Sequence, residues 1–208
     1  MELSKYKKIT ITNLIVLVNI IVFIITDRFS ILSEDPEWLL RFGAMEVSHI
    51  IDSHEYYRLF TANFLHFGIE HLGSNMVLLF LIGNLIEESV GKIRFSLIYI
   101  IGGILANIPS LVYNMIDAQE VVSAGASGAI FALCGALFWI TLRYPNLQKE
   151  VTLPRVIIFS FLSLASGFYT EGIDNFAHLG GFVFGFILAM ILIHPKNYRK
   201  GKAVYDEN

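Results

Sequence analysis

Six apolar stretches, each close to the length needed to cross a membrane, dominate this chain of 208 residues. A transmembrane helix needs about 20 mostly apolar residues, and only 16% of the residues are charged, against about 25% in a soluble domain. The pattern predicts an all-α polytopic membrane protein, with a single membrane domain over residues 1–208 and short tails at about 1–8 and 195–208. The stretches cover residues 9–27, 71–88, 93–114, 125–143, 151–168 and 175–194.

The basic residues indicate how this bundle is oriented. Twelve of the 15 Lys and Arg residues lie in the two tails and in the even-numbered connections, and the other three, Arg28, Arg41 and Arg58, lie in the first connection. Because positive charge is retained on the cytoplasmic side, we expect a multi-pass protein with both termini in the cytoplasm. The lysines of the tails suit lipid headgroups, and no basic tract suggests nucleic-acid binding.

The first connection, about residues 28–70, is long and rich in aromatic residues. Aromatic side chains suit the headgroup zone, so we expect an ordered interfacial element there rather than a loose linker. The remaining connections are short. The single cysteine, Cys134, excludes an internal disulfide and lies in an apolar run typical of a core position.

Ser127 stands among small residues at the start of the fourth stretch, within the sequence GASGA. Small residues around a serine allow membrane helices to pack closely, which gives one interpretation. The other is a nucleophile, because the free amides and the positive dipole end of a helix would stabilise an oxyanion beside it. The motif alone favours packing.

His178 lies early in the sixth stretch and shares a helix face with Gly181 and Gly185. The spacing Gly-x-x-x-Gly is a close-packing motif of membrane helices. The histidine is either held by a hydrogen bond to a neighbour or acts as an acid and base on a serine that this face brings close.

His71 and Asn75 are one helical turn apart at the start of the second stretch, so they point the same way. Structural hydrogen bonding and donation to an oxyanion are both open interpretations. A metal site is disfavoured because no third ligand follows at helical spacing. We expect no metal and no cofactor.

The predicted topology brings these polar groups to one depth. The second, fourth and sixth stretches all run inward, and His71 with Asn75, Ser127 and His178 each lie near the start of one of them. Polar groups inside a membrane are costly and mark functional sites. Their coincidence near the outer face favours a site over packing alone.

These motifs resemble those of the rhomboid family of intramembrane serine proteases. The family's G-x-S-G corresponds to residues 125–128, its H-x-x-x-N to residues 71–75, and its A-H-x-x-G-x-x-x-G to residues 177–185. The first connection carries Tyr57-Arg58 at the place of the family's aromatic–arginine pair. The resemblance implies a rhomboid-like bundle of six transmembrane helices with a long structured first outward loop. The six-helix layout resembles the bacterial members of the family, which implies a protein of a bacterial plasma membrane.

The resemblance also implies roles for the site residues. Ser127 is the nucleophile, His178 is the general base and later the acid, and the oxyanion hole consists of His71, Asn75 and the Ser127 backbone N–H. A dyad is implied rather than a triad, because Asp174 lies one turn before His178 and faces the loop. The supporting residues are Gly125, Gly128, Gly181, Gly185 and Arg58.

Other residues at family positions have less definite roles. Phe131 stands one turn after the serine and can stack on the histidine without donating a hydrogen bond, and Asn175 is a candidate polar neighbour of His178. Glu87 ends the second stretch, and no role is assigned to it. The fifth stretch and residues 169–175 are candidates for the lateral gate and cap of the family.

The implied function is an intramembrane endopeptidase that cleaves single-span transmembrane substrates near the outer membrane face. One alternative is a catalytically inactive relative that binds or escorts membrane clients, disfavoured because the chain keeps both members of the dyad. Another is a channel or transporter, disfavoured because no internal repeat is visible. The expected partners are transmembrane-helix proteins and lipid, and the sequence does not predict the oligomeric state.

Overall fold

The computed structural model describes residues 9–27, 35–144, 151–167 and 173–194. Each of the six apolar stretches forms one long helix, which confirms the expected all-α bundle, and the described residues contain no strand beyond an isolated bridge. The long helices are α1 (Ile11–Thr26), α5 (Gly68–Val90), α6 (Lys92–Ile116), α7 (Ser127–Arg143), α8 (Leu153–Ser166) and α9 (Asn175–Leu192).

The six helices differ in length. Helices α5, α6 and α9, with 23, 25 and 18 residues, are long and apolar enough to cross a membrane, whereas the apolar α1, α7 and α8 have 16, 17 and 14 residues. At about 1.5 Å per residue, α7 is about 26 Å long, shorter than a hydrocarbon core of about 30 Å. Helix α7 is thus shorter than the α5 and α6 helices on which it packs.

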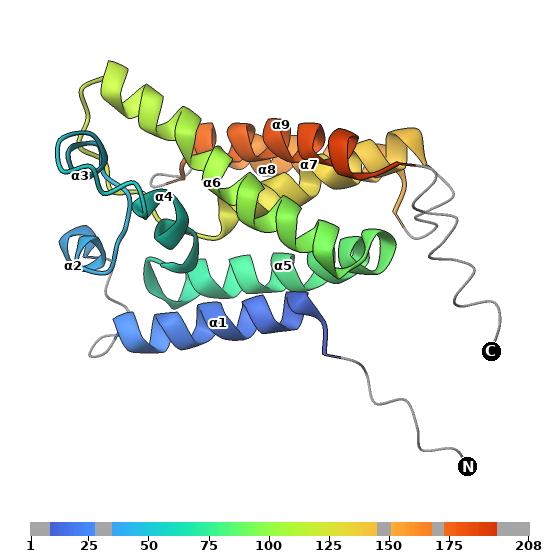
Figure 1. Ribbon diagram of the computed structural model, residues 1–208, viewed down its shortest axis with the longest axis horizontal. Helices are drawn as coiled ribbons and strands as arrows, with labels where there is room; N and C mark the ends of the chain where they lie inside the picture. The colour runs from blue at the N-terminus through green and yellow to red at the C-terminus, as the bar shows by residue number, and fades with distance from the viewer. Residues whose placement is uncertain (1–8, 28–34, 145–150, 168–172, 195–208) are drawn as a thin grey trace, which may run out of the picture.

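Helix α7 occupies the middle of the bundle. It contacts α5, α6, α8 and α9, and every residue from 128 to 137 is buried. A helix that is apolar on all sides must be surrounded by others, which fits this position. Helix α6 crosses the molecule obliquely, and α1 runs beside α5 (Figure 1).

Glycines allow α7 and α9 to pack backbone against backbone. A Cβ atom on Gly185 would collide with the carbonyl oxygen of Ala132, and one on Gly181 would collide with that of Gly128. At Gly135 the roles of the two helices are exchanged, because this glycine belongs to α7 and faces the carbonyl of Phe182 on α9. The predicted packing role of the glycine face of the sixth stretch is therefore confirmed, and it holds the start of α9 against the start of α7.

The described part of the first connection, residues 35–67, is ordered into short helices. They are α2 (Pro36–Leu40), α3 (Val47–Ile51), α4 (Arg58–Thr61) and the 3₁₀ turn η1 (Ala62–Phe64). They gather at the end of the bundle where α1 ends and α5 begins (Figure 1). This element is therefore the structured loop that the aromatic composition predicts.

Arg58 fastens this loop internally. Its side chain is 5% exposed, and its Nη1 donates to the carbonyl oxygens of Leu40 and Ala44, both at 2.8 Å. Its Nε donates to the Glu55 carboxylate at 2.5 Å. A planar guanidinium can bind several acceptors at once in this way, so Arg58 joins α4 to the end of α2 and the turn that follows it.

Glu87 joins the other end of α5 to the start of α1. Its carboxylate, 5% exposed, accepts hydrogen bonds from the backbone N–H groups of Ile11 and Thr12 and from the Thr12 hydroxyl, all at 2.8 Å. The first N–H groups of a helix have no partners within it, and a carboxylate there also complements the helix dipole. Glu87 thus caps α1.

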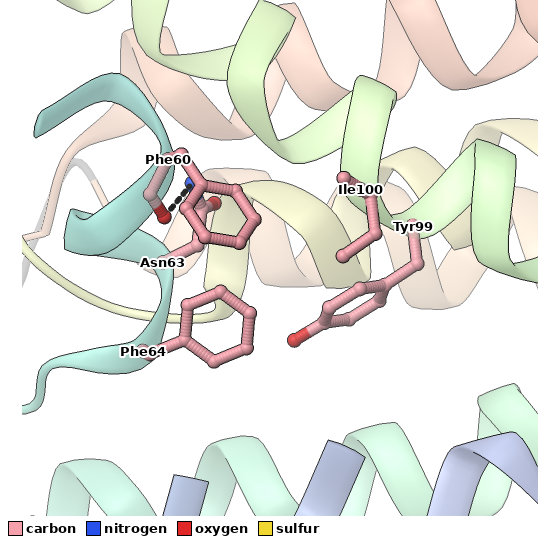
Figure 2. Close-up of a pocket in the computed structure, with 5 residues that line it drawn as sticks. All are labelled: Phe60, Asn63, Phe64, Tyr99 and Ile100. Carbon is pink, nitrogen blue, oxygen red and sulfur yellow. Dashed lines mark hydrogen bonds between the residues drawn. The ribbon is translucent and has the colours of Figure 1, made fainter. Parts of the chain in front are cut away.

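A small, mostly apolar hollow lies between α4–η1 and α6 (Figure 2). Asn63 lies at its wall and donates to the carbonyl oxygens of Leu59 and Phe60, at 2.8 and 3.3 Å. The Asn63 side chain also covers Gly103 of α6, where a Cβ atom would lie 2.7 Å from its Oδ1. The hollow contains none of the predicted site residues and marks where the loop docks on α6.

Candidate active site

The segment that leads into Ser127 is held by the first connection. The backbones of Ser123 and Met45 exchange two hydrogen bonds, of 2.8 and 2.9 Å. Two residues later, the Gly125 N–H donates to the carbonyl of Ala62 at 2.9 Å. The described loop therefore fixes the backbone from which the serine projects.

Gly125 brings the His71 ring close to the serine. Its φ is +141°, and a Cβ atom there would lie 2.9 Å from His71 Cε1, 3.0 Å from His71 Nε2 and 3.7 Å from the Ser127 Oγ. Glycine is therefore required both by the backbone conformation and by the imidazole next to it. The same measurements show that the imidazole and the hydroxyl both lie close to this one backbone position.

His66 contacts both the His71 ring and the backbone segment that leads into Ser127. Its Nε2 accepts a hydrogen bond from the backbone N–H of Ala126 at 3.4 Å, and its ring lies edge-on to that of His71, with centroids 5.2 Å apart. Burial, assisted by the neighbouring His71, lowers the pKa of His66 to about 3. The ring is therefore neutral near pH 7, as an acceptor nitrogen requires.

His178 lies in the first turn of α9, against the first turns of α7. Its side chain is 8% exposed, and its ring stacks on that of Phe131 with centroids 4.3 Å apart and planes 16° apart. Ser127 and Phe131 are four residues apart on α7 and so share a face. The stacking expected for Phe131 is present, and it holds His178 on the face of α7 that carries the serine.

Asn75 lies one turn after His71 on α5 and is 4% exposed. Among the residues that the structure describes, none forms a hydrogen bond with its Nδ2. A buried amide donor is costly to leave unpaired. Folded proteins leave few such groups unpaired, so the position of this amide requires an explanation.

Asp174 precedes α9 and caps it, because its Oδ1 accepts from the backbone N–H of Ala177 at 2.9 Å. Its Oδ2 accepts from the hydroxyl of Ser123 in the loop, at 3.0 Å, in line with the expectation that it faces the loop. No described group forms a hydrogen bond with His178 Nδ1. Within the described part of the chain, His178 has no carboxylate partner.

The structure places some of the predicted site residues at the start of α7 and the others further away. Ser127, His71 and Gly125 meet at the start of α7, and His178 packs against the same helix through Phe131 and Gly181. Gly128 contacts Ala106 of α6, and Gly185 lies two turns deeper. Arg58 does not contact these residues. It binds the carbonyl of Ala44, next to Met45, whose backbone pairs with Ser123. Asn175 packs on Gly167 at the end of α8.

The gate and cap are described only in part. Helix α8 packs on α7 and α9 and exposes an apolar face that includes Ile157, Ile158, Phe161 and Leu162. Residues 168–172, which belong to the expected cap or precede it, lie outside the described residues. Within the described residues, no group of three His, Cys, Asp or Glu side chains is arranged to hold a metal ion.

Sequence reasoning missed the contacts that support the site from a distance. The hydrogen bond from Ala126 to His66 and the pairing of Met45 with Ser123 join residues more than fifty positions apart. The Ser110 hydroxyl, which donates to Asp174, belongs to an apolar stretch with no motif around it. Two of these residues carried a signal: His66 is a histidine just before the second stretch, and Asp174 was expected to face the loop.

Comparison with known proteins identifies the family. Residues 53–195 match the model of the Rhomboid domain. The chain is 38% identical over 170 residues to rhomboid protease GluP of Bacillus subtilis and 39% identical over 163 residues to RHOMBOID-like protein 1 of Arabidopsis thaliana. These alignments cover 82% and 76% of this chain but only 32% and 40% of those longer proteins.

A shorter relative is matched over most of its length. The chain is 36% identical over 146 residues to the putative rhomboid protease YdcA of Bacillus subtilis, which covers 70% of this chain and 71% of that protein. The family model spans the last part of the first loop, from residue 53, and all the helices from α5 to α9. This protein is an integral membrane protein, and it belongs to the rhomboid family.

Proposed function

We propose that this protein is an intramembrane serine endopeptidase that cuts single-span transmembrane proteins with a Ser127–His178 dyad. The observation that carries the proposal is that residues of α5, α7 and α9 come together at the start of α7. Ser127 begins α7, the His71 ring lies beside Gly125 just before it, and His178 of α9 stacks on Phe131 one turn further on. The names of its relatives as rhomboid proteases support the same function.

In the proposed reaction, His178 takes the proton of the Ser127 hydroxyl while the oxygen attacks the carbonyl carbon of the scissile peptide bond. The protonated imidazole then gives this proton to the leaving amine, and a water molecule repeats the steps on the acyl-enzyme. Stacking on Phe131 and the close packing of Gly181 on α7 hold the ring in place of a third, acidic residue.

The tetrahedral oxyanion is proposed to bind between α5 and the first turn of α7. The residue before Ser127 is an alanine, which cannot cap the helix, so the first N–H groups of α7 are open to a ligand. Asn75 supplies a buried Nδ2 that has no partner among the described residues. The His71 ring, like the Ser127 hydroxyl, lies close to Gly125. Donors arranged before the reaction begins lower the energy of the charge that develops.

The site is proposed to lie below the outer membrane surface. Helix α7 is shorter than the bilayer core, and it starts beneath the ordered loop that holds residues 123–126. Water reaches such a position from the outer side without crossing the hydrocarbon. A substrate helix must unwind there, and helix-breaking residues in its upper turn lower that cost.

The activity is tested with purified protein reconstituted in liposomes with a transmembrane reporter. Ser127→Ala and His178→Ala are each expected to abolish cleavage, and His71→Ala and Asn75→Ala to lower kcat by about 100-fold each. Cys134→Ser, at a buried residue outside the site, is the matched control. Cleavage by the Ser127→Ala protein at the wild-type rate would refute the proposal, and client binding without cleavage would favour an escort protein.

The orientation is tested by cysteine labelling in intact cells. The native Cys134 is 1% exposed, so it contributes little background. Lys92, the first residue of α6, and Glu120, in the loop that follows α6, are both exposed. A membrane-impermeant maleimide is expected to label Glu120→Cys and to spare Lys92→Cys until the cells are opened. The reverse pattern would place the site on the cytoplasmic side.

A further inference from the structure

Asp174 makes more contacts than a helix cap requires. Its Oδ1 accepts from the Ala177 N–H of its own helix at 2.9 Å, which accounts for the cap. Its Oδ2 accepts two further hydrogen bonds, from the hydroxyl of Ser110 on α6 at 2.5 Å and from that of Ser123 at 3.0 Å. Hydrogen bonds to a carboxylate are about twice as strong as those between neutral groups. One side chain thus joins α6, α9 and the loop before α7.

The three elements that Asp174 joins determine where the nucleophile and the base lie. Ser123 is four residues before Ser127, and its backbone is already paired with Met45. On the other side, the carbonyl of Asp174 accepts from the backbone N–H of His178 at 3.1 Å. The 1% exposed Ser110 provides a fixed point on α6 between them.

We propose that Asp174 is a positioning residue that sets the Ser127 loop and the His178 helix at the separation that proton transfer needs. The proposal rests on the proposed function above. It assigns Asp174 a role different from that of a triad carboxylate, because its oxygens bind two serines and a backbone amide rather than the imidazole. Small errors in the position of reacting groups lower rates strongly, even when the fold is intact.

The test separates this role from helix capping. Asparagine is as good a cap as aspartate, so Asp174→Asn keeps the contact with Ala177 but loses the charge and one acceptor from the pair of serines. Asp117→Asn is the matched control. It makes the same change at an exposed residue at the start of the loop between α6 and α7, which also carries Ser123. Both proteins are compared with the wild type in the same detergent.

The readout is the rate at which a fluorophosphonate reacts with Ser127. In that reaction, the serine oxygen forms a bond to phosphorus, the phosphorus–fluorine bond breaks, fluoride leaves, and the proton passes to His178. We expect Asp174→Asn to lower this rate and the kcat for a transmembrane reporter by about tenfold, with KM within about twofold and the melting temperature almost unchanged. Asp117→Asn is expected to match the wild type in all four quantities.

A second variant keeps the test decisive if Asp174→Asn does not fold. Ser123→Ala removes the contact to the loop alone, and we expect it to lower the labelling rate several-fold. Where Asp174→Asn does fold, the double variant is expected to react no more slowly than Asp174→Asn. Wild-type labelling rates in Asp174→Asn or in Ser123→Ala, measured well below their melting temperatures, would overturn the inference. The proposed function fails separately, if Ser127→Ala still cleaves the reporter.

Discussion

The rings of Phe131 and His178 lie nearly parallel, with centroids 4.3 Å apart and planes at 16°. Phe131 projects from the same face of α7 as Ser127, one turn further on. The stacking therefore sets the orientation of the imidazole relative to the serine, in a site where no described carboxylate holds its Nδ1. An apolar ring thus orients the proposed base.

Phe131→Leu is expected to reduce catalysis more than stability. Leucine fills most of the volume but offers no flat face, so the imidazole gains freedom to rotate, and we expect kcat to fall about tenfold. Phe131→Tyr keeps the face and is expected to retain at least half of the wild-type kcat. The measurement is steady-state cleavage of a reporter, beside thermal unfolding. Equal kcat values for the leucine variant and the wild type would contradict the role of stacking.

Gly125→Ala is expected to abolish cleavage. Its φ of +141° disfavours any side chain, and the new methyl group would lie 2.9 Å from the His71 ring, so that the ring or the loop must move. Gly73→Ala is the matched control, because a Cβ atom at Gly73 would have no other atom within 4 Å and alanine favours a helix. We expect at least about a 100-fold loss of kcat in Gly125→Ala and wild-type activity in Gly73→Ala. A fully active Gly125→Ala protein would show that the loop tolerates this strain.

The helices could be predicted from sequence because one physical requirement determines them. A segment in hydrocarbon must satisfy its backbone hydrogen bonds internally, so apolar stretches of sufficient length become helices. The structure shifts their ends by at most three residues, as at α5, which begins at Gly68 rather than residue 71. The convergence of His71, Ser127 and His178 could also be predicted, since each stands near the start of the second, fourth or sixth stretch, and alternate helices of a bundle run in the same direction.

The supporting contacts could not be predicted, because they join residues that no local pattern links. Glu87 meets Thr12 across 75 positions, and Asp174 meets Ser110 across 64. Such pairs depend on how the helices pack, which is set by many small-residue contacts together. The sequence marked Glu87 as the end of a stretch and Asp174 as a residue that faces a loop, but the residues they bind became visible only in the folded chain.

Glu87→Gln is expected to destabilise the bundle. The carboxylate accepts three hydrogen bonds from the start of α1, and a glutamine side chain can replace at most part of them. Losing charge-assisted bonds at a buried cap costs about 1–3 kcal/mol. Glu88→Gln, at the exposed next position, is the matched control and is expected to change little. Unfolding in detergent measures both, and equal stabilities of the two variants would argue against the cap.

Arg58→Lys is expected to weaken the loop although it keeps the charge. An ammonium group cannot bind the Leu40 and Ala44 carbonyls and the Glu55 carboxylate with the geometry of a guanidinium. We expect unfolding to require at least about 1 kcal/mol less than in the wild type. Arg41→Lys, at an exposed position of the same loop, is the control. If both variants unfold like the wild type, the hydrogen bonds of Arg58 contribute nothing measurable.

The ion pair of Arg58 with Glu55 predicts a pH dependence of stability. The hydrogen bond from Arg58, more than any other interaction, lowers the pKa of Glu55 from its ordinary value of 4.5. A depressed folded-state pKa means that the stabilisation is complete above about pH 4.5 and is lost as the pH falls through the lower, folded value. The melting temperature of Glu55→Gln should therefore lie below that of the wild type at pH 7, and the gap should close towards pH 3. In an Arg58→Gln background, the same substitution should show a weaker dependence, because only the smaller effects of Tyr57 and His49 on the Glu55 pKa remain. In the wild-type background, a gap that stays constant with pH would show that Glu55 stabilises the loop without its charge.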